Sequence, residues 1–239
     1  MRHGRKIAVI IPAFDEADAI GKVINGVPDW VDKTIVADNA SGDGTAGIAE
    51  AHGAHVVHEP QAGYGAACLR GMEAVADHDI IVFMDGDYSD RGCEMHLLVD
   101  PIAEDLADMV IGSRTLGVAE TGSLTPQQRW GNWLACSLIR LFWGVRYTDL
   151  GPYRAISANS LTAIRMRDRA FGWTVEMQLK AILHGLRWRE VPVSYFNRIG
   201  VSKISGTVRG TALAGRAIIW TILRTALTAR HEKTRPDTG

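Results

Sequence analysis

The sequence predicts an α/β fold, with a mostly parallel central sheet flanked by helices. Through the first 115 residues, short apolar runs alternate with stretches of helical periodicity, which is typical of parallel, doubly wound sheets. The apolar runs are continuous, as at residues 80–84, and this indicates strands that are buried on both faces. With 239 residues, the chain is long enough to enclose a full hydrophobic core in one domain.

The first half of the chain is expected to contain five strands joined by four helices. Each expected strand is an apolar run that ends at turn-forming residues. We expect the strands at residues 6–11, 33–37, 54–58, 80–84 and 109–111. We expect the helices at residues 17–27, 45–52, 66–75 and 94–107, the last of them interrupted near Pro101.

The second half of the chain is less regular. A polar, glycine-containing stretch at residues 117–128 is expected to form a mobile loop over the site. Helices are predicted at residues 129–143, 159–166 and 174–184, with a strand that ends near residue 156 after the first of them. The last predicted strand, residues 186–195, contains Pro192, which favours an edge position. A long helix is predicted at residues 208–230, followed by a disordered tail at residues 231–239.

Charge is distributed unevenly along the chain. The formal net charge is −1, which argues against general nucleic-acid binding. From Arg198 onward, however, eight Lys and Arg face two acids, a net of +6, and the preceding residues carry a net of −7. One face of the long C-terminal helix combines arginine with large apolar residues: Arg209, Leu213, Arg216, Trp220, Arg224, Leu227 and Arg230. This pattern predicts contact with an anionic membrane surface, and packing on the body or on a second subunit, as in a homo-oligomer, is the alternative.

The cysteines and the ends of the chain bear on its compartment. Cys68, Cys93 and Cys136 have no metal-binding spacing and indicate reduced thiols. Neither a signal peptide nor a run of 18 apolar residues is evident. We therefore expect a cytoplasmic protein, attached peripherally to the inner face of the membrane if the C-terminal helix binds lipid.

Two carboxylates follow the fourth predicted strand. Asp85 and Asp87, separated by Gly86, come where the strand ends, and open α/β sheets bind ligands at the carboxyl ends of their strands. Carboxylate oxygens suit Mg²⁺ or Mn²⁺. A calcium loop is disfavoured, because Asp90 and His96 stand where that loop needs Gly and Glu. An ordinary turn is the structural alternative.

The loops after the other strands add candidate ligand contacts. Asp38 follows the second strand, so we expect it at the same edge of the sheet. Glu16 begins the first helix, where the helix dipole by itself accounts for an acidic residue. Gly63 and Gly65 permit a ligand to approach the backbone closely, and the helix that begins behind them is a candidate anion site. A tight turn is the alternative for the two glycines.

Several of these motifs, in this order, resemble the family 2 glycosyltransferases. They lie at residues 11–16 (Ile-Pro-Ala-Phe-Asp-Glu), 36–45, 63–65, 84–87 (Met-Asp-Gly-Asp) and 112–114 (Gly-Ser-Arg). Together with Arg198, Ser202 and Lys203, the order resembles the branch of the dolichol-phosphate mannose and glucose synthases. The resemblance covers about residues 6–205. It implies a GT-A domain at residues 1–205, followed by the basic helix at residues 206–230.

The resemblance also implies roles for individual residues. Those expected around the nucleotide and its sugar are Pro12, Ala13, Phe14, Glu16, Asp38, Gly63, Tyr64, Gly65 and Gly86. Those expected to hold a divalent metal, Mg²⁺ or Mn²⁺, on the diphosphate are Asp85 and Asp87, with Ser89 as a further ligand. Arg114 and Arg129 match arginines that bind the acceptor phosphate. The residues expected to close over the diphosphate are Arg198, Ser202 and Lys203.

The implied reaction moves a hexose from a nucleotide-diphosphate sugar to polyprenyl phosphate with inversion. UDP-glucose and GDP-mannose are both candidate donors. The alternative acceptor is a soluble alcohol, which needs a carboxylate to take its proton, and Glu176 and Asp149 are the candidates. A nucleotide-sugar-binding module without turnover is a further alternative. Two departures from the branch bear on the acceptor: Trp133 stands where polyprenyl-phosphate enzymes often carry serine, and no C-terminal spanning helix is expected.

Overall fold

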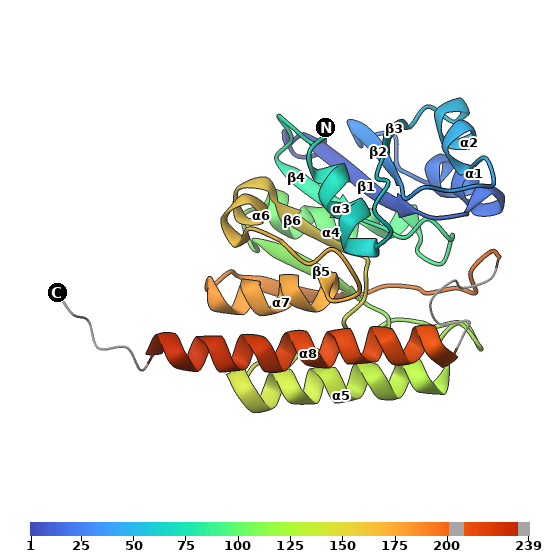
Figure 1. Ribbon diagram of the computed structural model, residues 1–239. Coiled ribbons are helices and arrows are strands. Elements are labelled where there is room, and N and C mark those ends of the chain that lie inside the picture. The colour runs from blue at the N-terminus through green and yellow to red at the C-terminus, as the bar shows by residue number, and fades with distance from the viewer. Residues whose placement is uncertain (201–207, 234–239) are drawn as a thin grey trace.

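The structure, a computed structural model, describes residues 1–200 and 208–233 of the chain (Figure 1). The strands of its sheet are β1 (Ile7–Ala13), β2 (Lys33–Asp38), β3 (His55–His58), β4 (Ile80–Phe83), β5 (Met109–Ser113), β6 (Arg154–Ser157) and β7 (Trp188–Pro192). The helices are α1 (Ala17–Asn25), α2 (Thr45–Ala51), α3 (Tyr64–Met72), the 3₁₀ turn η1 (Gly92–Glu94), α4 (Met95–Ala103), α5 (Pro126–Trp143), α6 (Ala158–Ile164), α7 (Trp173–Leu183) and α8 (Val208–Lys233).

The sheet is mostly parallel, as the alternation of apolar runs and helices predicts. Its strand order is β3-β2-β1-β4-β6-β5-β7. Only β6 runs antiparallel to its neighbours, β4 and β5, among the described strand pairs. Strand β7, which ends at Pro192, lies at an edge of the sheet, a position where proline is tolerated. The predicted fold class and the predicted edge strand are both confirmed.

Both faces of the sheet are covered, which explains why the strands are continuously apolar. Along β1, Ala8 and Ile10 belong to one hydrophobic cluster, whereas Ile7 and Val9 belong to the other, and all four are fully buried. Successive side chains of a strand point to opposite faces, so a strand between two cores needs an apolar residue at every position. Burial of each large aliphatic side chain contributes about 1.5–3 kcal/mol.

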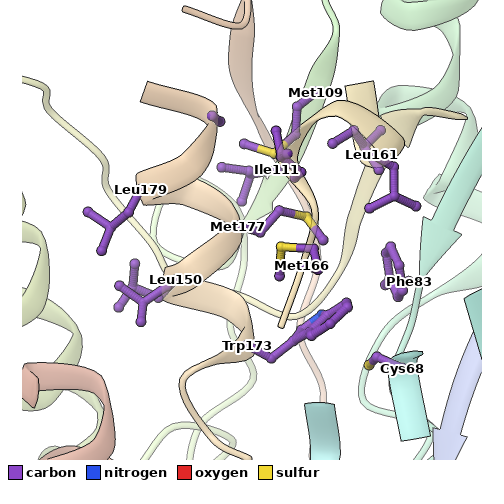
Figure 2. Packing of buried hydrophobic residues seen from close by; sticks show 14 of the residues in the cluster. Cys68, Phe83, Met109, Ile111, Leu150, Leu161, Met166, Trp173, Met177 and Leu179 are labelled. Carbon is purple, nitrogen blue, oxygen red and sulfur yellow. The ribbon is translucent and has the colours of Figure 1, made fainter. Parts of the chain in front are cut away.

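The two cores differ in composition. The cluster next to α1 and α4 is aliphatic, with Ile20 and Leu98 fully packed against the sheet. The cluster under α3, α6 and α7 is built around Trp173 and Phe83, whose rings meet edge to face with their centroids 5.7 Å apart. Figure 2 shows these two rings beside the methionine side chains of the same cluster. The helices α3 and α7 are therefore fixed against the sheet near the carboxyl end of β4.

Helices α5 and α8 form a further layer outside α7 (Figure 1). Ile222 of α8 is fully buried and belongs to the same hydrophobic cluster as Ile139 of α5. The long helix begins at the predicted residue and continues to Lys233, three residues past the predicted end. Its opposite side exposes large apolar residues, including Trp220 and Leu227. One side of α8 thus packs on the body, as the alternative interpretation of this helix stated.

Residues 117–128, predicted as a loop over the site, are hydrogen-bonded to Tyr195. Tyr195 N–H donates to Val118 O, and Glu120 N–H donates to Tyr195 O, at 2.9 and 2.8 Å. Leu124 is buried, and Thr125 forms a capping box with Gln128 at the start of α5.

Among the described residues, no helix has the length and apolarity needed to span a membrane.

Candidate active site

The carboxyl ends of β1, β2 and β4 lie at one edge of the sheet, because these strands are parallel neighbours. The loops that follow them surround a cleft of about 300 Å³, which we call the first cleft. Ten of the residues predicted to contact donor or metal line it: Pro12, Ala13, Phe14, Glu16, Gly63, Tyr64, Asp85, Gly86, Asp87 and Arg198. Motifs from four separate parts of the chain therefore meet at one site.

Asp85 is a half-buried carboxylate that lines the first cleft. The Tyr64 hydroxyl donates to its Oδ1 at 3.2 Å. Burial and the charge of nearby Asp87 raise the pKa of Asp85 to about 7, although the positive charge of Arg198 opposes this rise. Two neighbouring buried carboxylates repel each other, so the pair favours a bound cation.

Asp87 is held in place from both sides. The Ser89 backbone N–H and hydroxyl donate to Asp87 Oδ1 at 2.9 and 2.5 Å. Arg198 Nη2 lies 2.9 Å from Asp87 Oδ2. Ser89 is fully buried and does not line the first cleft. The structure therefore places Ser89 as a residue that orients Asp87, and not in the position of the further metal ligand that we expected.

The segment around Arg198 crosses the loop that carries the carboxylates. Arg198 pairs with Glu16 at 3.1 Å as well as with Asp87, and Ile199 N–H donates to Asp87 O at 2.9 Å. Residues from the start and from the end of the predicted domain therefore meet across the first cleft. Ser202 and Lys203, expected on the same segment, lie outside the described residues.

The two glycines at the start of α3, Gly63 before the helix and Gly65 in its first turn, lie close to protein backbone. Gly65 N–H and Ala66 N–H, at the start of α3, donate to the carbonyl oxygens of Ala170 and Arg169 at 3.1 and 2.9 Å. A Cβ atom at Gly63 or at Gly65 would lie 2.1 Å from a carbonyl oxygen of this same segment. The predicted anion site at the start of α3 is therefore wrong for these two amides, because protein carbonyls already cap them. Gly63 lines the cleft, whereas Gly65 does not.

Asp38 lies just behind the first cleft. It is buried, and its Oδ2 lies 3.3 Å from Nδ1 of His58. Its neighbour Asn39 lines the cleft and holds the loop together, because its side-chain amide donates to Glu59 O and its Oδ1 accepts from Gly63 N–H. Asp38 itself does not line the first cleft, and Asn39 is the residue of this loop that faces it.

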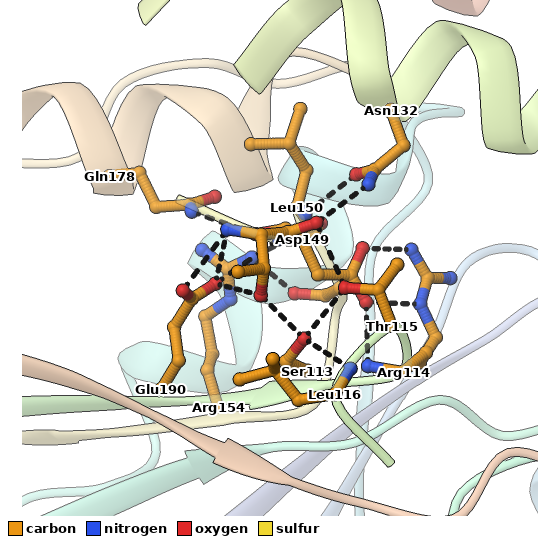
Figure 3. A network of polar contacts seen from close by, with 12 residues as sticks. Ser113, Arg114, Thr115, Leu116, Asn132, Asp149, Leu150, Arg154, Gln178 and Glu190 are labelled. Carbon is orange, nitrogen blue, oxygen red and sulfur yellow. Dashed lines mark hydrogen bonds and ion pairs between the residues drawn. The ribbon is translucent and has the colours of Figure 1, made fainter. Parts of the chain in front are cut away.

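A second cavity of about 490 Å³ lies between α5 and the loop at residues 146–149. Both arginines that we expected at an acceptor phosphate, Arg114 and Arg129, line it. Arg114 is already paired, because its Nη2 and Nε lie 2.7 and 2.8 Å from the two carboxylate oxygens of Asp149 (Figure 3). Its backbone N–H donates to Asp149 as well. The charge and hydrogen bonds of Asp149 keep the pKa of Arg114 raised although burial opposes this.

The loop that carries Asp149 is held by side chains from three elements, as Figure 3 shows. Glu190 accepts from the N–H groups of Thr148 and Asp149 at 2.9 and 3.1 Å. Asn132 of α5 accepts from Leu150 N–H at 2.9 Å, and Gln178 of α7 donates to Asp149 O at 3.0 Å. This wall of the second cavity is therefore rigid, since three elements fix it.

A comparison with protein families shows which family the chain belongs to. The family model described as "Glycosyl transferase family 2" matches residues 8–165. The chain belongs to glycosyltransferase family 2. The match runs from β1 through the end of α6, and so it includes Asp85, Asp87 and Arg114.

Individual relatives extend this result over the whole chain. This glycosyltransferase is 32% identical to an uncharacterized glycosyltransferase of Mycobacterium tuberculosis, over 88% of this chain and 95% of that protein. It is 29% identical to the undecaprenyl-phosphate mannosyltransferase of Micrococcus luteus, over 98% and 99%. Glucosyl-3-phosphoglycerate synthase of Mycobacterium tuberculosis, solved with Mn²⁺, UDP and glucosyl-3-phosphoglycerate, matches with a TM-score of 0.76 at 24% identity, over 99% of this chain and 82% of that chain. This structural likeness confirms the GT-A fold.

Neither carboxylate that we expected as a base for an alcohol acceptor faces the first cleft of the glycosyltransferase. Asp149 is only 1% exposed and is committed to Arg114. Glu176 accepts from Asp168 N–H at 2.8 Å and lies 2.8 Å from Lys180, so it holds the segment that packs on Gly63. Both side chains have partners within the protein, and their role as a base stays a prediction.

Four residues that line the first cleft were not among the predicted site residues: Asn39, Ala62, Ala67 and Phe171. Asn39 follows Asp38 in a loop that we had marked as a ligand loop, so its position was the available signal. Phe171 lines the cleft from the segment before α7, more than 80 residues beyond Asp85, and no motif marks it. Its place depends on the packing of residues 168–172 against the start of α3.

Proposed function

We propose that this protein is a metal-dependent, inverting glycosyltransferase that moves a hexose from a nucleotide-diphosphate sugar to polyprenyl phosphate. The observation that carries the proposal is the pair Asp85 and Asp87 at the carboxyl end of β4, facing Arg198 across the first cleft. The end-to-end likeness to an undecaprenyl-phosphate mannosyltransferase supports the acceptor class. UDP-glucose and GDP-mannose are the donors to test.

The first cleft suits a divalent metal, Mg²⁺ or Mn²⁺. The raised pKa of Asp85, which follows from burial and from the charge of Asp87, marks a place where a cation is favoured. Among the described residues, no three His, Cys, Asp or Glu side chains converge into a metal cage. Mg²⁺ is commonly held by one or two carboxylates together with substrate phosphates, so an open pair of acids fits it. When bound, such a metal neutralises charge that develops on the leaving diphosphate.

The protein's own groups complete the donor site in this proposal. Arg198 turns from Asp87 toward the diphosphate, whose oxygens are strong acceptors for a guanidinium. Phe14, Tyr64 and Phe171 supply the apolar and aromatic walls against which a base and a sugar bind. Ser202 and Lys203, next to Arg198 in the sequence, are assigned to the same closing segment.

The transfer itself needs no protein base if the acceptor is a phosphate. An acceptor phosphate oxygen forms a bond to the anomeric carbon while the bond from that carbon to the diphosphate breaks, and its electron pair goes to the diphosphate. The acceptor is already anionic near neutral pH, so arginines suffice to position it. The structural roles of Asp149 and Glu176 support this version over an alcohol acceptor, which requires a carboxylate to take its proton.

We further propose that the layer of α5 and α8 contacts an anionic membrane surface, at its inner face. Both helices expose large apolar side chains: Trp130, Trp133 and Leu141 on α5, and Leu213, Trp220, Leu223 and Leu227 on α8. Exposed tryptophan next to arginine suits the headgroup region of a bilayer. The three free thiols support a reducing compartment. A second subunit is the other occupant that this surface accommodates.

The proposal is tested by sugar transfer from labelled UDP- and GDP-sugars to a short polyprenyl phosphate, with Mg²⁺ or Mn²⁺. We expect a lipid-soluble labelled product from one donor, and no product from Asp87→Ala, whose folding is checked by thermal unfolding. Normal transfer by the variant contradicts the metal assignment. If product forms only with a phosphorylated soluble alcohol such as phosphoglyceric acid, the proposed donor site still holds, and the acceptor belongs to the alternative class.

A further inference from the structure

Residues 196–199, which carry the arginine that pairs with Asp87, lie against the loop of that aspartate. Ile199 N–H donates to Asp87 O at 2.9 Å, and Phe196 N–H donates to Ser89 O at 3.0 Å. The backbone is therefore held by hydrogen bonds on both sides of the arginine that lines the first cleft.

A single guanidinium connects the side chains of the same two segments. The Cζ atom of Arg91 lies 4.4 Å from the centroid of the Tyr88 ring and 3.9 Å from the centroid of the Phe196 ring. Tyr88 directly follows Asp87, and Phe196 begins the segment at residues 196–199. A cation over the face of an aromatic ring is attracted to it, and the attraction grows where water is excluded. Arg91 thus bridges the two segments by side-chain contacts, beside their backbone hydrogen bonds.

No carboxylate competes for the charge of Arg91. The half-buried side chain forms no ion pair with any residue in the part of the chain that the structure describes. Its backbone is anchored instead, because Arg91 O accepts from the hydroxyl of the buried Tyr153 at 3.1 Å. The two rings are therefore the contacts that this guanidinium serves within the described residues.

Tyr88 has a backbone conformation that needs support from its surroundings. Its φ is +68°, in the left-handed region that bulky residues other than glycine rarely occupy. Such strain persists where neighbouring contacts hold it in place. The Ser89 N–H and Asp87 Oδ1 are joined across this residue, at 2.9 Å. The contact of Arg91 with the Tyr88 ring therefore supports the turn that orients Asp87.

The structural alternative is that Arg91 only covers two rings at the surface. Arg2 shows that arrangement elsewhere in the molecule, since its Cζ lies 4.9 Å from the centroid of the Trp30 ring and neither residue lines the two cavities of the site. Arg91 differs, because its two rings lie one and two residues away from side chains that line the first cleft.

We propose that Arg91 is a positioning residue, which holds residues 196–199 on the loop of Asp87 and so keeps Arg198 at the first cleft. The inference rests on the proposed function and deepens it, because it names a residue outside the cleft on which donor binding depends. A group that is already in place loses less conformational entropy when a ligand binds. The side chain of Arg198 turns to the diphosphate while its backbone stays docked.

The first test is calorimetric titration of the full chain with UDP and, separately, with GDP, each with Mn²⁺. We expect Arg91→Gln to weaken binding of the nucleotide that the wild type binds about tenfold, a factor that corresponds to about 1.4 kcal/mol. Phe196→Leu keeps an apolar side chain but removes the ring, so it is expected to weaken binding as well. The double variant is expected to bind about as weakly as Arg91→Gln alone, because both substitutions remove the same contact. Arg2→Gln is the matched control, and its nucleotide binding is expected within twofold of wild type.

The second test is hydrogen exchange without any ligand. The amides of Phe196 and Ile199 are expected to exchange about tenfold faster in Arg91→Gln than in wild type. The amides of β1 are expected to keep their protection, which shows that the variant is folded.

Three results each overturn the inference: nucleotide binding by Arg91→Gln within twofold of wild type, unchanged exchange of the two amides, and additive losses in the double variant. A wild type that binds neither nucleotide contradicts the proposed function instead. In that case the exchange measurement, which needs no ligand, by itself decides whether Arg91 holds residues 196–199 in place.

Discussion

At the scale of single residues, the site consists of charged groups whose partners are already in place. Asp87 is oriented by Ser89 and pairs with Arg198, and Asp149 forms an ion pair with Arg114. Residue type alone does not separate these two aspartates, although one faces a cleft and the other is a structural counter-ion. Their partners decide the difference.

Substitution of Ser89 by Ala is expected to lower kcat/KM for sugar transfer about tenfold while the fold stays intact. The buried hydroxyl donates a charge-assisted hydrogen bond to Asp87, and such a bond is worth about 1.5–3 kcal/mol. The measurement is steady-state transfer kinetics beside a Mn²⁺ titration. Ser123→Ala is the control, because that hydroxyl donates only to Glu120 O at the surface. Equal kinetics in the two variants would falsify the orienting role.

Substitution of Glu176 by Gln is expected to leave transfer within about threefold of wild type. The carboxylate accepts from backbone amides and pairs with Lys180, and it takes no part in the first cleft. A loss of two orders of magnitude in kcat, in a variant with normal unfolding, would restore Glu176 as a general base. Transfer kinetics with a lipid and with a soluble acceptor provide the measurement.

Removal of the Asp149 charge is expected to lower the free energy of unfolding. Asp149→Asn leaves Arg114 buried without its counter-ion, and breaking one partner of a buried pair costs about 3–5 kcal/mol. Urea unfolding monitored by tryptophan fluorescence measures the change. A destabilisation below about 1 kcal/mol would contradict the buried pairing.

At the scale of elements, the start of α3 is defined by its contact with the segment before α7. Two carbonyl groups of residues 169 and 170 cap its first amides, and the glycines allow that approach. The same segment carries Phe171 into the first cleft. The shape of the first cleft therefore depends on two elements that are about 100 residues apart in the chain.

Gly65→Ala is expected to destabilise the protein by more than about 2 kcal/mol, because the added methyl group would lie 2.1 Å from Asp168 O. Gly131→Ala provides the opposite control. Gly131 lies inside α5 with no atom within 4 Å of a new Cβ, so alanine is expected to stabilise by about 0.5–1 kcal/mol. Both values come from urea unfolding, and the same sign for both variants would refute the argument.

At the scale of the whole molecule, ion pairs at the surface make stability depend on pH, and the outer layer of α5 and α8 is the part that we expect to contact a membrane. The hydrogen bond from Arg187 holds the pKa of Asp108 below its ordinary value, and the hydrogen bond from Arg2 does so for Asp100. A lowered folded-state pKa contributes stability above the unfolded-state value, and that stability is lost as pH falls through the folded-state value.

Asp108→Asn is therefore expected to be less stable than wild type at pH 7 and equal to it at a pH below the lowered pKa of Asp108. The difference follows from the proton that the unfolded carboxylate binds more readily than the folded one. Thermal unfolding over a pH series measures it. If the difference in stability between Asp108→Asn and wild type instead grew as the pH falls, the pKa of Asp108 would not be lowered in the folded state.

The membrane contact is tested on the same scale. The double variant with Trp220→Ala and Leu227→Ala is expected to lose most of its co-sedimentation with vesicles that contain anionic lipid, because both side chains are more than half exposed on α8. Leu106→Ala, at an exposed site after α4, is the matched control. Unchanged sedimentation together with a shift from dimer to monomer would assign the layer to a second subunit.

The sequence by itself determined the fold class and most of the donor cleft. Continuous apolar runs predict strands covered on both faces, and parallel strands bring their carboxyl ends to one edge whatever the details of packing. Motifs placed directly after those strands, such as residues 12–16 and 85–87, are therefore located by local chain order. Seven of the ten predicted residues that line the first cleft belong to these two motifs.

The tertiary structure alone decided which polar groups are available to a ligand. Glu176, Asp149 and the amides at the start of α3 looked available in the sequence, but each is already satisfied by another protein group. Hydrogen bonding of buried groups depends on which segments meet in space, and the order of residues along the chain does not contain that information.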